Sequence, residues 1–158
     1  MNDLRFPMFI SLENEKVVIF GGGKVAYRRA NTLLLFHADI TVVAPKHCEE
    51  MTSLSSKVKC VFEIYQECYL TPDTFIVIAA TNEEKTNEEI YKQCKMRNIL
   101  VNNASNQEQC DFFFPAVVME EDIVVGIAGN GSNHKKVSAF AKKLREEDSN
   151  RGEIDEKN

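Results

Sequence analysis

The stretch VVIFGGGKVAYRRA, residues 17–30, places three consecutive glycines between an apolar run and a segment with helical spacing. Gly21, Gly23 and Ala26 match the pattern G-x-G-x-x-G/A, which belongs at the turn from a first strand into a first helix. The first glycine permits a tight turn, the second lets a pyrophosphate approach the backbone, and Ala26 lets the helix pack closely. The free N–H groups at the helix start then face the anion. The stretch therefore predicts a dinucleotide site.

Two alternatives to a dinucleotide site are a phosphate-binding P-loop and a structural turn. A phosphate-binding P-loop would need glycine at Val18 and serine or threonine at Val25, so the spacing excludes it. A glycine turn of purely structural use remains the alternative.

The rest of the chain alternates apolar runs with helical patterns, which is typical of a parallel sheet. We predict an α/β fold: a Rossmann-like parallel sheet with helices on both faces, followed by a β-hairpin and a C-terminal helix. The expected strands are 16–20, 39–45, 57–64, 74–80 and 98–104, the expected helices are 24–37 and 82–97, the hairpin pairs 116–120 with 122–128, and the last helix covers about 133–146.

Length and charge predict the domain organisation. A chain of 158 residues suits one domain, which we place at residues 1–145 as an NAD-binding Rossmann-like domain with the hairpin and helix appended. Residues 146–158 hold six acidic residues against Arg151 and Lys157, and Ile154 is their only large apolar side chain. We expect this acidic tail to be disordered.

Composition narrows the partners and the location. No apolar run approaches the roughly 20 residues of a membrane span, and the N-terminus lacks a signal-peptide pattern. The five cysteines form no C-x-x-C pair, so neither a zinc site nor a disulfide framework is expected. We expect a cytoplasmic protein with no metal, nucleic-acid or membrane partner.

The end of the second strand lacks the usual ribose ligand. An acid about 20 residues after the first glycine commonly binds the ribose hydroxyls, whereas this chain has Val43, Ala44, Pro45 and Lys46. Lys46 would suit the 2′-phosphate of NADP, and backbone groups of Pro45 and Lys46 would serve NAD equally well. The residues alone leave both cofactors open.

Several stretches together resemble the NAD-dependent precorrin-2 dehydrogenase family, which also forms the N-terminal module of sirohaem synthase. They are FPMFISLENEKVVIFGGGKVAYRRANTLL, ITVVAP, IVIAATNEEKTNEEI, VNNASNQEQCDFFFPAVV and IVVGIAGNGS. The leading Phe-Pro, the Ala-Ala-Thr-Asn and the Phe-x-x-Pro occur in the family's order. The resemblance implies transfer of a hydride from precorrin-2 to NAD, which gives sirohydrochlorin, and implies a homodimer.

The resemblance also implies positions for the cofactor and substrate. The NAD contacts fall on Lys24 and Val25 after the glycines and on Pro45 and Lys46 after the second strand. Thr81 and Asn82, after the fourth strand, are expected along the nicotinamide half, although Asn82 suits a helix cap equally well. Four bases are candidate partners for the carboxylates of the tetrapyrrole, each also an ordinary surface base: Arg28, Arg29, Lys135 and Lys136.

This chain departs from the family at its catalytic position. The family has a catalytic aspartate just after the fifth strand, where Ser105 stands here, and a neutral serine cannot act as a carboxylate base. Asp111 is a candidate substitute, with a cap or turn as its alternative role. The family's G-x-S-P is Gly131, Ser132, Asn133 and His134 here, so His134 is a candidate acid or base or an exposed loop histidine.

Two function classes follow. The first is an NAD-dependent precorrin-2 dehydrogenase without ferrochelatase activity, because no cluster of His, Cys or acids supplies metal ligands. The second is a non-catalytic relative that binds a dinucleotide or a tetrapyrrole as a carrier or sensor. The intact glycine loop favours the first, and Ser105 favours the second.

Overall fold

The computed structural model describes residues 6–129 and 134–155. The chain divides into two compact units, one formed by residues 10–113 and one by residues 1–9 together with 114–158. The NAD-binding domain expected over residues 1–145, with the hairpin and helix appended, stays a prediction.

The unit of residues 10–113 is built on a five-stranded parallel sheet in the order β3-β2-β1-β4-β5. This is the strand order of a Rossmann-type half, with the topological switch between β1 and β4. The elements of this unit are β1 (Lys16–Phe20), α1 (Lys24–Leu34), β2 (Asp39–Val43), α2 (Glu49–Ser53), β3 (Lys59–Val61), η1 (Glu67–Tyr69), β4 (Thr74–Ala79), α3 (Glu84–Met96), β5 (Leu100–Asn103) and η2 (Gln107–Gln109). The predicted parallel sheet is confirmed, although β2, β3 and β5 are shorter than the expected ranges, β3 most of all.

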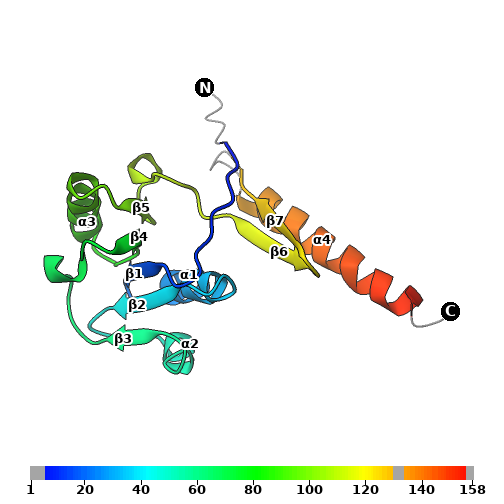
Figure 1. Ribbon diagram of the computed structural model, residues 1–158, viewed down its shortest axis with the longest axis horizontal. Coiled ribbons are helices and arrows are strands. Elements are labelled where there is room, and N and C mark those ends of the chain that lie inside the picture. Colours follow the sequence, from blue (N-terminus) through cyan, green and yellow to red (C-terminus); the bar gives the residue numbers. More distant parts are fainter. Residues whose placement is uncertain (1–5, 130–133, 156–158) are drawn as a thin grey trace. The chain divides into compact units, whose positions relative to one another are not determined.

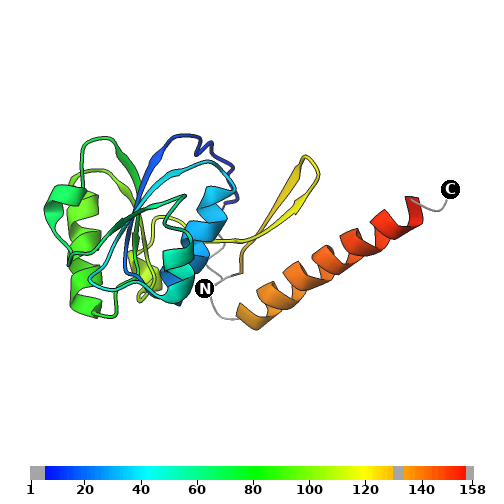
Figure 2. The ribbon, with the colours of Figure 1, turned by 90° about the horizontal axis from the view of Figure 1, so that it is seen from below.

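Helices cover both faces of this sheet, as the sequence predicted. Figures 1 and 2 show α1 and α2 on one face and α3 on the other. On the α1 face, Ala26, Ala30 and Leu33 are buried at helical spacing. On the α3 face, Ile90 and Cys94 are fully buried against strand residues. Their apolar stripes therefore hold the sheet in the middle of a three-layer core.

The second unit contains a hairpin and a long helix. Strands β6 (Ala116–Glu120) and β7 (Ile123–Ile127) pair antiparallel and form a two-stranded sheet of their own. Glu121 occupies the left-handed region with φ of 50°, which suits the two-residue turn. The hairpin is confirmed, but it is a separate sheet and is not added to the parallel one.

Helix α4 (His134–Asp155) extends beyond the predicted end near residue 146. The structure therefore gives a helical backbone to the predicted disordered tail as far as Asp155, while residues 156–158 lie outside the described residues. Lys, Arg, Glu and Ala, which are strong helix formers, are frequent in this helix as far as Glu147, whereas its continuation to Asp155 contains the weaker helix formers Asp, Ser, Asn and Gly. The ion pair between Lys142 and Glu146, one helical turn apart at 3.5 Å, adds to this preference.

Candidate dinucleotide site

The register of the sheet brings the predicted site residues to one edge. Phe20, the last residue of β1, pairs with Val43 of β2 and with Ala79 of β4, and Ala79 pairs in turn with Asn103 of β5. The loops that follow these four strands therefore start side by side. Open parallel sheets bind ligands at this carboxyl edge. The edge holds the predicted residues that follow β1, β2, β4 and β5.

The glycine loop is packed against the protein at its first two positions. Gly21 has φ of 126°, and a Cβ there would lie 2.2 Å from the carbonyl oxygen of Ala80. A Cβ on Gly22 would lie 2.1 Å from the carbonyl oxygen of Lys46. Gly21 is thus required by the turn, as predicted, whereas the packing role of Gly22 was missed. The motif assigns roles to Gly21 and Gly23 and treats the position of Gly22 as variable, so no sequence signal indicated the packing of Gly22.

Gly23 lacks such a packing constraint. A Cβ on Gly23 would meet nothing within 4 Å, and its φ of −87° suits any residue. Gly23 is the N-cap of α1, and no side chain caps the helix there. The first N–H groups of a helix have no partner within the helix and carry partial positive charge. An uncapped helix start with open space in front of it fits the pyrophosphate of a dinucleotide.

Lys24 and Val25 start α1 and are both exposed. The Nζ of Lys24 lies 4.0 Å from a carboxylate oxygen of Glu50, in an exposed pair of little energetic weight. Ala26 is fully buried, as its predicted role in close helix packing requires.

The loop after β2 is fixed by its backbone. Gly21 donates a hydrogen bond to the carbonyl of Val43 (2.9 Å), and the N–H of Cys48 donates to the carbonyl of Gly22 (2.8 Å). Pro45 and Lys46 are exposed between these two anchors. Because the loop is tied to the glycines on both sides, it lies beside the open start of α1.

A polar network joins the ends of β4 and β5. Asn87 of α3 is fully buried, and its Oδ1 accepts hydrogen bonds from the N–H (3.0 Å) and the hydroxyl (2.7 Å) of Thr81. Its Nδ2 donates to the carbonyl of Thr81 (3.1 Å) and to Oγ of Ser105 (3.1 Å). The hydroxyl of Ser105 donates to Oδ1 of Asn103 (2.7 Å). The structure thus links the predicted residues Thr81 and Ser105 through Asn87.

Asn82 is exposed in the loop before α3. The N-cap of α3 is Glu83, so Asn82 does not occupy the cap position. The hydroxyl of Thr81 accepts a hydrogen bond from the N–H of Glu83 (3.2 Å), so Thr81 contributes to the helix start.

The part of the chain that forms this edge matches a known protein family. Residues 8–116 match the family described as "Putative NAD(P)-binding". The chain belongs to this NAD(P)-binding family. The match covers β1 to β5 and therefore every element that forms the edge described above.

Two similar proteins of known description are longer than this chain. The "Probable multifunctional siroheme biosynthesis protein HemA" of Ruminiclostridium josui is 41% identical over 143 residues, which cover 89% of this chain and 28% of that protein. The siroheme synthase of Psychrobacter arcticus is 42% identical over 142 residues, covering 89% of this chain and 25% of that protein. The chain thus spans about a quarter of the length of these relatives. The predicted resemblance is confirmed.

A solved structure described as "SirC, precorrin-2 dehydrogenase" has the same fold. The TM-score is 0.77 at 24% sequence identity, and the alignment covers 89% of this chain and 69% of that chain. The predicted Rossmann-like fold with a hairpin and a final helix is confirmed.

Asp111, the candidate substitute for the missing carboxylate, has a structural role. One of its carboxylate oxygens accepts a hydrogen bond from the N–H of Val101 on β5 (3.0 Å), and the other lies 2.6 Å from the Nζ of Lys95. Its own N–H donates to the carbonyl of Val101 (2.9 Å). Hydrogen bonding and charge from Asp111 raise the pKa of Lys95. The alternative role as a turn or cap therefore describes Asp111 better.

Replacing Asp111 by alanine is expected to lower the free energy of unfolding by about 1–3 kcal/mol, because the edge-strand N–H of Val101 loses its acceptor. The Asp111→Asn variant keeps an acceptor for Val101 and is expected to lose less. Urea unfolding followed by circular dichroism measures both. Dinucleotide affinity should stay within about twofold of wild type if Asp111 has no role in the site; a large loss in a folded variant would contradict this assignment.

The predicted substrate-binding bases have different environments. Arg28 is exposed, whereas the guanidinium of Arg29 is half-buried and donates a hydrogen bond to Oδ1 of Asn102 on β5 (2.5 Å). Burial lowers the pKa of Arg29 to about 10. Arg29 therefore ties α1 to the sheet. Lys135 and Lys136 are exposed on α4 in the other compact unit.

The remaining predictions concern residues outside this edge. Gly131, Ser132 and Asn133 lie outside the described residues, and His134 is the first residue of α4. Across residues 6–129 and 134–155, no group of three or more His, Cys, Asp or Glu side chains is arranged to hold a metal ion. None of the helices in that part of the chain combines the length and apolar composition needed to cross a bilayer.

The buried asparagines are what the sequence interpretation missed. Asn87 occupies the apolar stripe of α3, at helical spacing from Ile90 and Cys94. A polar residue in an apolar stripe indicates that its side chain is buried and forms hydrogen bonds with other buried polar groups. That signal was available in the sequence, although its partners were not.

Proposed function

We propose that this protein is an NAD-dependent dehydrogenase that oxidises precorrin-2 to sirohydrochlorin. The observation that carries the cofactor part is the open space at Gly23, in front of the uncapped start of α1. The substrate is proposed from the relatives, which are named as siroheme biosynthesis proteins, and from the printed name of the solved structure. Ferrochelatase activity is not part of the proposal.

In this proposal the parts of NAD lie along the carboxyl edge of the sheet. The backbone of Gly21 to Gly23 and the first N–H groups of α1, at Lys24 and Val25, would bind the pyrophosphate. Backbone groups of Pro45 and Lys46 would bind the adenosine ribose. Thr81, Asn82 and Ser105 would line the nicotinamide half. When bound, NAD accepts the hydride that leaves the substrate.

A turnover assay tests the proposed dehydrogenase activity. Purified protein is incubated with NAD and precorrin-2, and the absorbance of NADH and of sirohydrochlorin is followed. We expect both products in equal amounts. NAD binding without either product would refute the dehydrogenase proposal.

The second candidate is a non-catalytic relative that binds a dinucleotide or a tetrapyrrole as a carrier or sensor. A specific observation favours it: the hydroxyl of Ser105 donates its proton to Asn103, so the position of the family's aspartate holds no proton acceptor of comparable strength. Tetrapyrrole binding measured by fluorescence quenching, in the absence of turnover, would support this candidate.

We expect NAD to bind about tenfold more tightly than NADP. A 2′-phosphate would approach Lys46, an exposed base of small energetic weight, but also Glu49 and Glu50 at the start of α2. Calorimetry with both cofactors measures the ratio. Lys46→Ala should leave NAD affinity nearly unchanged, and Glu50→Gln should raise NADP affinity. Tighter binding of NADP that disappears in Lys46→Ala would reverse the assignment.

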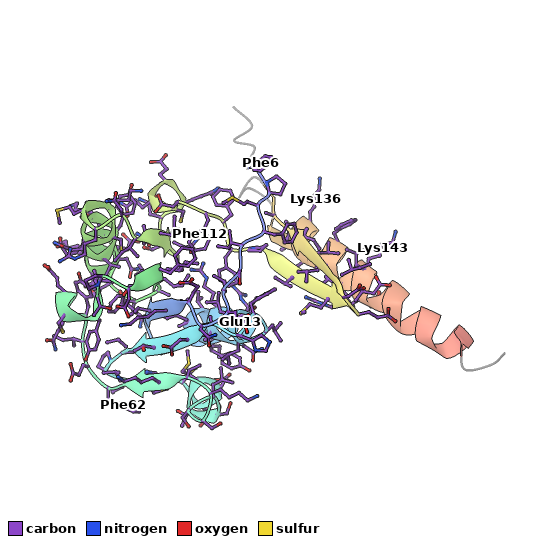
Figure 3. All side chains as sticks on the ribbon, viewed as in Figure 1. Phe6, Glu13, Phe62, Phe112, Lys136 and Lys143 are labelled. Atoms are coloured by element: carbon purple, nitrogen blue, oxygen red, sulfur yellow. The ribbon has the colours of Figure 1, made fainter. Side chains whose placement is uncertain are left out.

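We also propose that the protein is a homodimer formed through its second compact unit. Met119, Ile123 and Phe140 are 43%, 56% and 54% exposed in that unit. An open groove in that unit is lined by Ile127 of β7 and by Val137 and Phe140 of α4. Lys136 and Lys143 of α4 also line this groove (Figure 3). A second copy that covered these apolar side chains would remove them from water. Light scattering should give the mass of a dimer for wild type, and a monomer for Phe140→Glu; a monomeric wild type at micromolar concentration would contradict the proposal.

The tetrapyrrole partner and the cytoplasmic location are proposed on the relatives alone. The tetrapyrrole carries carboxylates that Arg28, Lys135 or Lys136 would attract. These roles stay predictions.

A further inference from the structure

The polar network at the ends of β4 and β5 fixes the direction of its own hydrogen bonds. Backbone groups set the orientation of both buried amides. The N–H of Thr81 can only donate, so the atom of Asn87 that faces it is the oxygen. The N–H of Ser105 can only donate, so the atom of Asn103 that faces it at 2.9 Å is also the oxygen. Neither amide can be turned over without pairing two donors.

These two orientations determine the proton of Ser105. Nδ2 of Asn87 points at the Ser105 oxygen and donates to it, so this oxygen is an acceptor there. Oδ1 of Asn103 has no hydrogen, so the hydroxyl of Ser105 must donate to it. The single proton of Ser105 is therefore committed to the protein, and the hydroxyl can only accept a further hydrogen bond.

The network also leaves an accepting position on Ser105 for a ligand. All four hydrogen-bonding positions of the Asn87 amide are filled by Thr81 and Ser105. Nδ2 of Asn103 donates to Oε1 of Gln109 (2.7 Å). A hydroxyl oxygen has two lone pairs, and the structure gives the second one on Ser105 no partner among the described residues. Ser105 is exposed, whereas Asn87 and Asn103 are buried, so this lone pair is the accessible acceptor.

We propose that Asn87 is a positioning residue that holds Ser105 as an acceptor for the carboxamide N–H of the nicotinamide ring. This inference rests on the proposed NAD site, in which the nicotinamide half lies at the carboxyl ends of β4 and β5. The carboxamide group is the hydrogen-bond donor of the nicotinamide ring. Asn87 acts only through Ser105, by fixing the position and the proton direction of its hydroxyl.

The experiment compares NAD with 3-acetylpyridine adenine dinucleotide, in which a methyl group replaces the carboxamide NH₂. Binding of both dinucleotides is measured by calorimetry, and the readout is the ratio of their dissociation constants. We expect wild type to prefer NAD by about 2- to 10-fold, the range that one neutral hydrogen bond supplies. Ser105→Ala should bring the ratio close to one, and so should Asn87→Ala.

The double variant tests whether Asn87 acts through Ser105. If it does, adding Asn87→Ala to Ser105→Ala leaves the ratio where Ser105→Ala put it. Asn102→Ala is the matched control, because it removes another buried amide of β5 that binds Arg29 and the carbonyl of Phe112. This control should lose stability without changing the ratio, which separates positioning from a loss of fold.

The outcomes are distinct from those of the proposed function. A ratio that Ser105→Ala leaves unchanged, in a protein that binds NAD and forms NADH, overturns this inference while the dehydrogenase stands. A ratio that falls in Ser105→Ala but not in a folded Asn87→Ala variant removes Asn87 from the assignment and so also contradicts it. Wild type that binds neither dinucleotide overturns both proposals. Ser105→Ala is exposed and small, so the test does not depend on the folding of Asn87→Ala.

Discussion

Replacing Gly23 by valine is expected to weaken NAD binding at least about 100-fold while the protein stays folded. The new side chain would occupy the open space in front of α1, where a Cβ meets nothing within 4 Å. It would keep the pyrophosphate from the first N–H groups of the helix. Charge-assisted hydrogen bonds contribute about 1.5–3 kcal/mol each, so loss of two accounts for this factor.

Calorimetry measures the affinity, and thermal unfolding measures the fold of the Gly23→Val variant. Valine is a poorer N-cap than glycine, so we expect a loss of about 1 kcal/mol in unfolding free energy. Leu35→Ala, an exposed change at the other end of α1, is the control and should leave affinity unaltered. Unchanged NAD affinity in Gly23→Val would mean that the dinucleotide binds elsewhere.

Replacing Gly21 by alanine is expected to destabilise the fold, whereas Gly23→Val mainly weakens NAD binding. A Cβ at Gly21 would lie 2.2 Å from the backbone oxygen of Ala80, and φ of 126° is strained for any side chain. Backbone strain costs about 1–3 kcal/mol and overpacking about 1–3 kcal/mol more. The expected loss of about 2–6 kcal/mol in the free energy of unfolding is a large part of the stability of a small domain.

Urea unfolding and the yield of folded protein measure this effect. Because Ala80 directly follows β4, the clash would separate β1 from β4, the two strands at the topological switch of the sheet. Gly23→Ala is the matched control, since it adds the same methyl group two residues later where space is open. A Gly21→Ala protein as stable as Gly23→Ala would show that the loop can move away from Ala80.

The parallel sheet was predictable because its signals are local. The run from Val17 to Phe20 is apolar throughout, as a strand buried on both faces requires, and the glycines that follow mark the turn. The run from Thr74 to Ala79 has the same character. The end of β3 differs most from its expected position, because Phe62 and Ile64 after Val61 are as apolar as the strand itself.

The site was only partly predictable, because its remaining contacts depend on register. Thr81 and Ser105 are 24 positions apart in sequence and meet through Asn87 only because Ala79 pairs with Asn103. No local pattern contains that pairing. The position of Gly23 was predictable from the motif, whereas the packing of Gly22 on the loop after β2 required coordinates.

The final helix and the hairpin show a different limit. Residues 146–155 have a low apolar content and include Asp, Ser, Asn and Gly, which are weak helix formers, so their composition does not predict that the helix continues to Asp155. The hairpin pattern was correct, but a two-stranded pattern does not reveal whether its edge joins another sheet.

The orientation of the Asn103 amide limits which residues can occupy position 105 in related proteins. An aspartate at position 105 would bring a carboxylate oxygen toward Oδ1 of Asn103, and two acceptors without a proton between them repel. Asn103 could not turn its amide to donate instead without losing the N–H of Ser105. Positions 103 and 105 should therefore change together: homologues that carry aspartate at 105 are expected to carry at 103 a residue other than asparagine. Ser105 and Asn103 are therefore matched to each other. Replacing Ser105 alone by aspartate would introduce a negative charge next to Asn103, which cannot donate a hydrogen bond to it.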